Sequence, residues 1–211
     1  MINRRAFRIS TAAVLTVFVL IGLYYLSSSK SLQFFGEIYP RINTTQRIVA
    51  LTFDDGPSPK TDTVLSILDS HNVKATFFLS GYSMSHYFSE TQRIVNAGHE
   101  VGNHTYSHKR LILKSYKRVG FEIAQTDSLI RKAGYKSEIH FRPPHAKKLL
   151  ILPYYLKQHK RKTILWDIEP ESIKSISNDS ELMAEYVVKN SGNGSIILLH
   201  PMYDWGNESI N

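Results

Sequence analysis

Residues 49–57 read Val-Ala-Leu-Thr-Phe-Asp-Asp-Gly-Pro. The apolar first part is typical of a buried strand, whose side chains alternate between two faces. This strand ends on two adjacent carboxylates, Asp54 and Asp55, and the turn-forming pair Gly56-Pro57 follows. Neighbouring negative charges repel each other unless a cation lies beside them. Taken alone, the pair is more often an Asp-Gly turn before a helix, so its meaning depends on the rest of the chain.

Short apolar runs alternate with helical patterns from residue 47 onward. Strands are predicted at 48–53, 75–79, 99–102, 139–141, 163–166 and 195–199, and helices at 61–71, 85–97, 115–133, 148–160 and 179–190. This alternation predicts an α/β domain with a parallel sheet or barrel. In such folds reactive groups gather where strands end. The ionisable residues that follow predicted strands are Asp54, Asp55, His104, Arg142, Asp167, Glu169 and His200.

The first thirty residues have a different composition. An uncharged, mostly apolar stretch at 9–26 follows three arginines and is long enough to span a bilayer core. We therefore predict a cytoplasmic tail at 1–8, a transmembrane anchor or uncleaved signal at 9–26, a polar linker at 27–46 and a catalytic domain at 47–211. The arginines place the domain outside the cytoplasm, periplasmic or at the cell surface. Cleavage of the apolar segment would instead make the protein secreted.

Charge and cysteine content exclude several classes of protein. The net charge is +8, but four of the 26 basic residues and none of the 18 acidic ones lie in residues 1–30, which leaves +4 for the rest. No basic run interleaved with aromatic residues is present, so we expect no nucleic-acid partner. The chain has no cysteine and therefore no disulfide.

Two histidines, His104 and His108, lie four residues apart, a spacing that lets both rings reach one metal ion. Alone, such a pair is equally often a surface or capping pair. One carboxylate of the Asp54–Asp55 pair would complete a set of two histidines and one aspartate, with open positions for water and substrate. The cation would also relieve the repulsion between the carboxylates, and the other aspartate is then free to act as a general base. The pattern alone does not decide which aspartate has which role.

Two further residues complete an acid–base set. His200 ends the most apolar strand, where a core histidine is the ordinary explanation, but beside a metal and a base we expect a second acid–base group. Arg142 precedes Pro143-Pro144, a rigid segment that would fix its guanidinium. An arginine beside the free aspartate would keep that carboxylate ionised and oriented.

Four motifs occur in order: Thr52-Phe-Asp-Asp-Gly-Pro57, His104-Thr-Tyr-Ser-His108, Arg142-Pro-Pro-His145 and Ile197-Leu-Leu-His200. Together they resemble the polysaccharide deacetylases of carbohydrate esterase family 4, the NodB-homology family, over about residues 45–200. The resemblance implies a distorted (β/α)7-type barrel and a divalent metal, most often Zn2+. It also implies hydrolysis of N-acetyl groups on an N-acetylglucosamine-containing polysaccharide such as chitin oligomers, peptidoglycan or exopolysaccharide.

The resemblance assigns a role to each motif residue. It implies Asp54 as the general base, Arg142 as the residue that orients it and His200 as the general acid. The implied metal ligands are Asp55, His104 and His108. A backbone N–H at His145 would stabilise the oxyanion, and Leu198 would line the pocket for the acetyl methyl group.

Three departures from the family pattern matter. His145 stands where the family usually has Tyr or Phe. Ser172 and Ile173 replace the residues associated with tuning the catalytic histidine, so Asp167 or Glu169 is predicted to substitute. The family continues through another helix and strand after His200, so we expect a C-terminally incomplete barrel or a gap that exposes residues 196–199. The alternative function is a catalytically impaired glycan-binding protein that keeps the fold. A non-haem iron oxygenase fits less well, because its carboxylate ligand usually lies close to the first histidine.

Overall fold

The computed structural model describes residues 4–203, and for residues 4–12 the backbone alone. The strands are β1 (Ile38–Tyr39), β2 (Ala50–Asp54), β3 (Thr76–Leu79), β4 (Glu100–Asn103), β5 (Thr163–Ile164) and β6 (Ile196–Leu199). The α-helices are α1 (Arg4–Ser28), α2 (Thr61–Ser70), α3 (Gly81–His86), α4 (Phe88–Asn96), α5 (Tyr116–Lys132), α6 (Ile151–Gln158) and α7 (Ser180–Asn190). Two short 3-10 turns are η1 (Pro144–Ala146) and η2 (Pro170–Ser172).

The strands pair in parallel around a ring. One sheet has the order β4-β3-β2-β6, and β1 pairs with β5. Isolated parallel bridges join β4 to Phe141, Phe141 to β5, and Ile168 to β6. The α/β class with a parallel sheet is therefore confirmed, and the pairings lead from one edge of the sheet round to the other. All the carboxyl ends point the same way, as a site at one rim requires.

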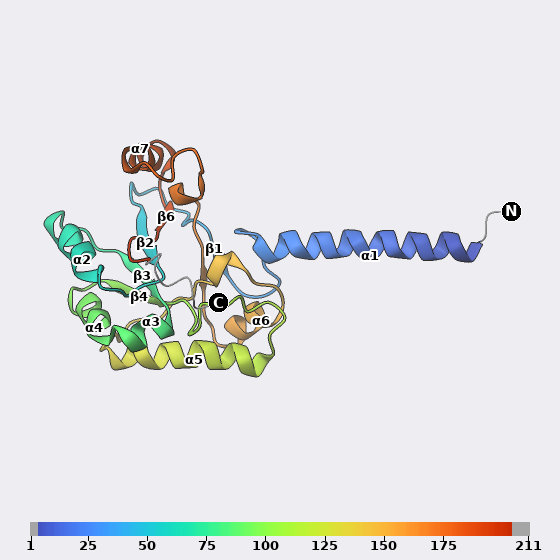
Figure 1. Cartoon of the computed structure of the whole chain (residues 1–211), viewed down its shortest axis with the longest axis horizontal. Coiled ribbons are helices and arrows are strands. Elements are labelled where there is room, and N and C mark those ends of the chain that lie inside the picture. Colours follow the sequence, from blue (N-terminus) through green and yellow to red (C-terminus); the bar gives the residue numbers. More distant parts are fainter. Residues whose placement is uncertain (1–3, 204–211) are drawn as a thin grey trace.

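Both faces of the central strands are buried, as expected for a parallel sheet covered by helices. In β3, Phe77 and Leu79 pack into the main core with Ile94 and Ile130 from α4 and α5. Phe78, on the opposite face of the strand, is also fully buried and lies against the Arg142 guanidinium. In Figure 1 the long helix α5 runs beneath the sheet, and it contacts α3, α6 and β4.

Most predicted elements are present with shifted ends. The helix predicted at 85–97 is two helices, α3 and α4, which meet at Tyr87. The strand predicted at 139–141 is reduced to bridges at Phe141. These shortened strands still place their carboxyl ends at the common rim.

Residues of the predicted linker at 27–46 contact the domain, because Ile38 and Tyr39 pair with β5 and Ile42 N donates to Gly194 O at 2.9 Å. The expectation that a gap exposes residues 196–199 is wrong for residues 196–198. They are buried between β2 on one side and Ile168 on the other.

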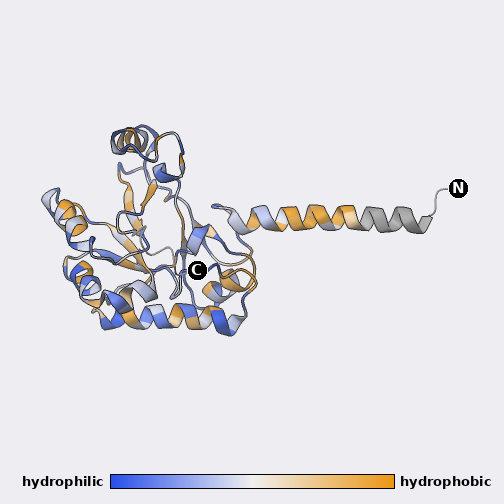
Figure 2. Cartoon of the chain, in the orientation of Figure 1, coloured by the Kyte–Doolittle hydropathy of each residue, from blue (hydrophilic) through white to orange (hydrophobic). Residues whose placement is uncertain are grey.

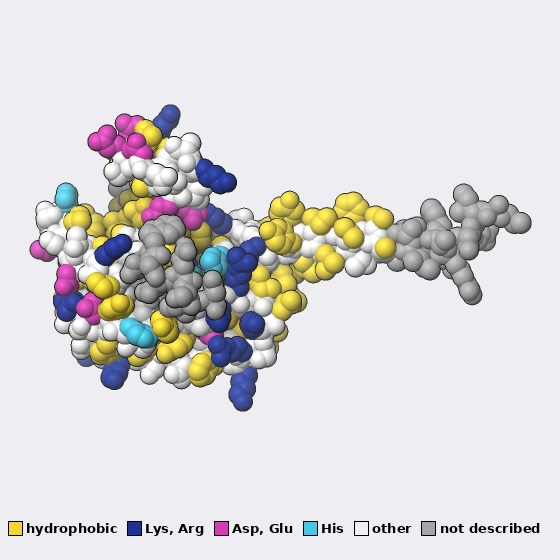
Figure 3. Space-filling view, in the orientation of Figure 1, with side chains coloured by type: hydrophobic (Ala, Val, Ile, Leu, Met, Phe, Trp, Pro, Cys, Tyr) yellow, Lys and Arg dark blue, Asp and Glu magenta, His cyan; other side chains and the backbone are white. Residues whose placement is uncertain are grey.

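Helix α1 extends away from the domain (Figure 1), and its apolar residues form a continuous hydrophobic stretch next to the domain (Figure 2). Side chains such as Phe18 and Tyr25 are about two-thirds exposed, and Figure 3 shows this apolar surface standing clear of the domain. Within the described part of the chain, no helix is long and apolar enough to cross a membrane. The predicted span over residues 9–26 is thus not confirmed, and residues 1–3 of the predicted tail lie outside the described residues.

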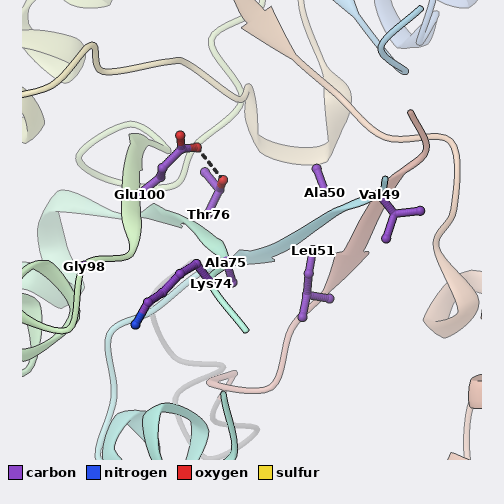
Figure 4. A pocket seen from close by; sticks show the side chains of 8 residues that line it. All are labelled: Val49, Ala50, Leu51, Lys74, Ala75, Thr76, Gly98 and Glu100. Atoms are coloured by element: carbon purple, nitrogen blue, oxygen red, sulfur yellow. Dashed lines mark hydrogen bonds between the residues drawn. The ribbon is translucent and has the colours of Figure 1, made fainter. Parts of the chain in front are cut away.

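A hollow of about 340 Å³ opens at the amino ends of β2, β3 and β4 (Figure 4). Its wall contains Val49, Leu51 and Lys74, and Thr76 donates a hydrogen bond to Glu100 at 2.8 Å. It lies at the end of the sheet opposite to the predicted site residues.

Candidate active site

Most predicted site residues lie at or just after the end of a strand or bridge of the ring. Asp54 is the last residue of β2 and Asp55 follows it, while His104 follows β4 and His200 follows β6. Arg142 comes directly after Phe141, the residue that bridges β4 and β5. Residues nearly 150 positions apart therefore meet at one rim because parallel strands present their carboxyl ends to the same side.

Asp54 is held by Arg142. The guanidinium Nη1 donates to Asp54 Oδ1 at 2.8 Å and to Thr52 Oγ1 at 2.8 Å. Its other nitrogens donate to the carbonyls of Ile164 and Leu165, and Phe78 packs against its face. Both partners of this ion pair are buried. A buried arginine with four hydrogen bonds fixes the orientation of the carboxylate beside it. The role of Arg142 in orienting a general base stays a prediction.

Asp55, His104 and His108 form a cluster whose ligand atoms all lie within 4.8 Å of one another. His108 Nε2 is 2.9 Å and His104 Nε2 is 3.5 Å from Asp55 Oδ1. His104 Nδ1 lies 2.7 Å from the carbonyl of Arg142, to which it donates as the N–H tautomer. That hydrogen bond leaves the lone pair of Nε2 directed at the aspartates, which is the usual arrangement of a metal-binding histidine.

The electrostatics of this cluster fit a cation. Burial lowers the pKa of His104 to about 4 against the opposing charge of Asp54, so its ring is neutral and able to ligate. Burial disfavours the charged form of Asp55, but the hydrogen bond and charge of His108 hold its pKa well below the usual range. The buried Oδ1 of Asp55 lies between two imidazoles, 2.9 Å from His108 Nε2 and 3.5 Å from His104 Nε2. A buried carboxylate oxygen that faces two imidazoles suits a divalent cation.

His200 is held by an acid that differs from the predicted ones. Its Nδ1 is 2.5 Å from Glu171 Oε2, and its backbone N–H donates to Glu171 Oε1 at 2.9 Å. Burial lowers the pKa of His200, but the hydrogen bond to Glu171 and the charges of both aspartates raise it to about 9. Its Nε2 lies 4.0 Å from Asp55 Oδ2. The ring is therefore protonated at neutral pH and faces the site.

The predictions for Asp167 and Glu169 are wrong. Asp167 accepts hydrogen bonds from Ser195 Oγ and the backbone of Ile196, while Glu169 accepts one from Trp166 Nε1 at 2.7 Å. Neither forms a hydrogen bond or an ion pair with His200 in the described part of the chain. Glu171 was not predicted, because it lies one position before Ser172, where the family pattern places the tuning residue. The η2 turn and the longer glutamate side chain bring its carboxylate to His200.

The last two predicted residues lie beside the cluster. His145 has a left-handed backbone (φ 55°), and its ring is 5.2 Å from that of His108. Leu198 is buried with Ala146, Leu165 and Trp166 in an apolar cluster next to the rim. Nothing in these contacts assigns the two residues an oxyanion or methyl-binding role, so both roles stay predictions.

The fold and the site together define a parallel α/β protein with a buried aspartate–arginine pair, an Asp-His-His cluster and a histidine–glutamate pair at one rim. A family model described as polysaccharide deacetylase matches residues 41–164. The chain belongs to this family.

Known relatives support membership of the same family. The peptidoglycan-N-acetylmuramic acid deacetylase PdaC of Bacillus subtilis is 34% identical over 77% of this chain and 34% of that protein. Its solved structure matches with a TM-score of 0.67 and 32% identity over 77% of this chain and 78% of that chain. A peptidoglycan-N-acetylglucosamine deacetylase of Bacillus cereus is 37% identical over 72% of this chain and 55% of that protein. The chain thus spans about a third to a half of the length of these two relatives.

A further solved structure bears on the loss of activity within the family. It is a mutant of a pseudoenzyme of carbohydrate esterase family 4 in which enzymatic activity was restored. It matches with a TM-score of 0.68 and 26% identity over 82% of this chain and 61% of that chain. The fold therefore occurs both with and without catalysis.

Proposed function

We propose that this protein is a metal-dependent hydrolase that removes N-acetyl groups from an N-acetylglucosamine-containing polysaccharide and releases acetate. The observation that supports this most strongly is the arrangement of the rim. A base held by arginine (Asp54), a set of three ligands and an acid held by glutamate (His200) face one another within a few ångströms. Peptidoglycan is the substrate class that the names of the relatives favour.

The residues Asp55, His104 and His108 would hold the divalent cation, and a set of two imidazoles and one carboxylate favours zinc. When bound, such an ion supplies a Lewis acid that polarises a carbonyl and lowers the pKa of water. Asp54 accepts the proton of the attacking water, and Arg142 keeps its carboxylate pointed at that water.

Breaking the amide bond needs a proton donor, because an amine cannot leave as an anion. His200 is protonated at neutral pH and transfers its proton to the departing sugar nitrogen. Glu171 favours the charged ring before that transfer. Water adds to the carbonyl carbon, the C–N bond breaks, and the products are acetate and a free amino sugar. We assign the backbone N–H of His145 to the carbonyl oxygen and Leu198 to the methyl pocket as part of this proposal.

The relatives named for peptidoglycan favour action outside the cytoplasm, where that polymer lies. Attachment to a membrane through residues 9–26 and the division of the chain at residue 47 stay predictions.

The decisive experiment measures acetate release from peptidoglycan, chitin oligomers and an acetylated exopolysaccharide, with the metal removed by a chelator and then restored with zinc. We expect release from at least one glycan only when the metal is present. Glycan binding without acetate release under every metal condition would instead establish the alternative, a catalytically impaired glycan-binding protein.

A further inference from the structure

The carboxylate of Glu122 is buried behind the metal-binding motif. The residue lies in the middle of α5 and is 0% exposed. Its Oε2 accepts the backbone N–H groups of Tyr106 at 3.0 Å and Ser107 at 2.8 Å. Its Oε1 accepts the Ser107 hydroxyl at 2.9 Å and is paired with Arg118, four residues earlier on the helix. One side chain thus binds three donors that all lie between His104 and His108.

The loop that Glu122 binds is conformationally strained. Thr105 and His108 both have left-handed backbones, with φ of 66° and 54°, which cost free energy for residues with a Cβ. Such conformations persist only when surrounding contacts impose them. His108 is itself one of the three ligands of the cluster, so the strain falls on a residue whose ring position decides the geometry of the site.

Two groups of contacts hold the loop from opposite sides. The carbonyls of Thr105 and Tyr106 accept the N–H groups of Gly81 and Tyr82 at the start of α3, at 2.9 and 2.8 Å. On the side of α5, Glu122 accepts hydrogen bonds from the N–H groups of Tyr106 and Ser107. Because a buried N–H without an acceptor is costly, loss of the Glu122 carboxylate would favour another backbone path between the two histidines.

We propose that Glu122 is a positioning residue that sets the affinity of the Asp55–His104–His108 cluster for a divalent cation. It does so by fixing the backbone between the two histidines. This inference rests on the proposed function, because it takes those three residues as the ligands. The carboxylate does not contact the cluster itself and acts through the peptide groups of Tyr106 and Ser107. Partners behind a metal ligand of this kind change affinity 10- to 100-fold in other proteins.

Three variants of the full chain test the inference by graded removal of the contacts. Glu122→Leu removes every acceptor and is expected to weaken zinc binding by about 10- to 100-fold. Glu122→Gln keeps a similar shape and one acceptor oxygen, and a smaller loss is expected. Arg118→Met leaves both carboxylate oxygens in place and is expected to bind zinc within about 3-fold of the wild type. Zinc affinity is measured by competition with a chromophoric chelator, and the visible spectrum of the Co2+ form reports the ligand geometry.

A destabilised control separates positioning from general loss of stability. Ile130 lies on the same helix, is buried in the main core and does not contact the loop, so Ile130→Val lowers the melting temperature without touching the site. We expect its zinc affinity and Co2+ spectrum to match the wild type. An equal loss of affinity in Ile130→Val, or wild-type affinity and an unchanged spectrum in both Glu122 variants, would overturn the inference. Failure of the wild type itself to bind zinc would overturn the proposed metal site.

Discussion

Two adjacent aspartates at this rim have different contacts because their backbones differ. Asp54 ends β2 in an extended conformation, and its side chain is buried against Arg142. Asp55 has a left-handed backbone with φ of 73°, which turns its carboxylate toward His108. A positive φ is uncommon for residues other than glycine and is most tolerable for Asp and Asn. The two carboxylates therefore face different partners, Arg142 and His108, as the proposed roles of base and ligand require.

The proposed roles predict that the same change, Asp to Asn, affects activity and zinc binding differently at the two positions. Asp54→Asn removes the proton acceptor but none of the three ligands, so acetate release is expected to fall by about 10²- to 10⁴-fold with zinc still bound. Asp55→Asn is expected to lose zinc together with activity. Steady-state acetate assays and metal analysis of both purified variants test this, and full activity in Asp54→Asn would refute the assignment of the base.

Glu171 predicts a change in pH dependence. In the proposed mechanism His200 acts in its protonated form, so activity declines as pH rises through the pKa of that ring, which Glu171 helps to raise to about 9. Glu171→Gln removes the negative charge, and the alkaline limb of kcat/KM is expected to move to lower pH by about one unit. Glu169→Gln is the matched control, because Glu169 bonds Trp166 and not His200. An alkaline limb that stays in place in Glu171→Gln would contradict the role of this acid.

At the scale of elements, the end of α1 and the residues that follow it pack against the segment around η1. The backbone N–H of Lys148 donates to Ser27 O at 2.9 Å, and its buried ammonium donates to Ser29 O. Lys30 pairs with Glu169 and lies over the Trp166 ring. Residues predicted as a linker thus support the loop that carries Arg142 and His145.

The buried ammonium of Lys148 predicts a pH-dependent stability. Burial and the neighbouring charge of Lys147 lower its pKa from 10.5 to about 8. Between these values the unfolded chain binds more protons than the folded chain, so folding becomes more favourable as pH rises from 8 to 10.5. The free energy of unfolding of the wild type relative to Lys148→Met is expected to increase by about 1–3 kcal/mol over that interval. Denaturant titrations at pH 8 and pH 10 measure it, and a constant difference would contradict it.

At the scale of the whole molecule, the site exists only when the ring of strands is assembled. The three ligands come from the ends of β2 and β4 and from the loop beyond β4, so the unfolded chain holds no preformed site. A ligand that binds only the folded state stabilises it by mass action.

Zinc is therefore expected to raise the melting temperature, with a stabilisation of about 4 kcal/mol at a concentration 1,000 times the Kd. A chelator should reverse the shift, and Asp55→Asn should abolish it. Thermal unfolding with and without zinc tests this, and an equal shift in Asp55→Asn would place the ion elsewhere.

Sequence patterns predicted the class of fold and most of the rim, because both depend on local signals. The alternation of short apolar runs and helical periodicity indicated the parallel α/β sheet, and the Asp-Asp and His-x-x-x-His spacings indicated the ligand cluster that the structure brings together. Glu171, Glu122 and the packing of residues 27–30 were not predicted. Each depends on a contact between distant segments that leaves no periodic trace in the sequence.

The sequence alone indicated that a strand ends at Asp54-Asp55 and that the two charges need a cation beside them. Both inferences rest on local properties, the alternation of side chains along a strand and the repulsion of neighbouring charges. Which acid serves His200, how the strained loop of His108 is held and how the edges of the sheet are joined depended on the tertiary structure. Two side chains from distant segments meet only if the path of the backbone brings them close and each side chain is long enough to reach. At the rim, that path placed Glu171 beside His200 and left Asp167 and Glu169 to other partners.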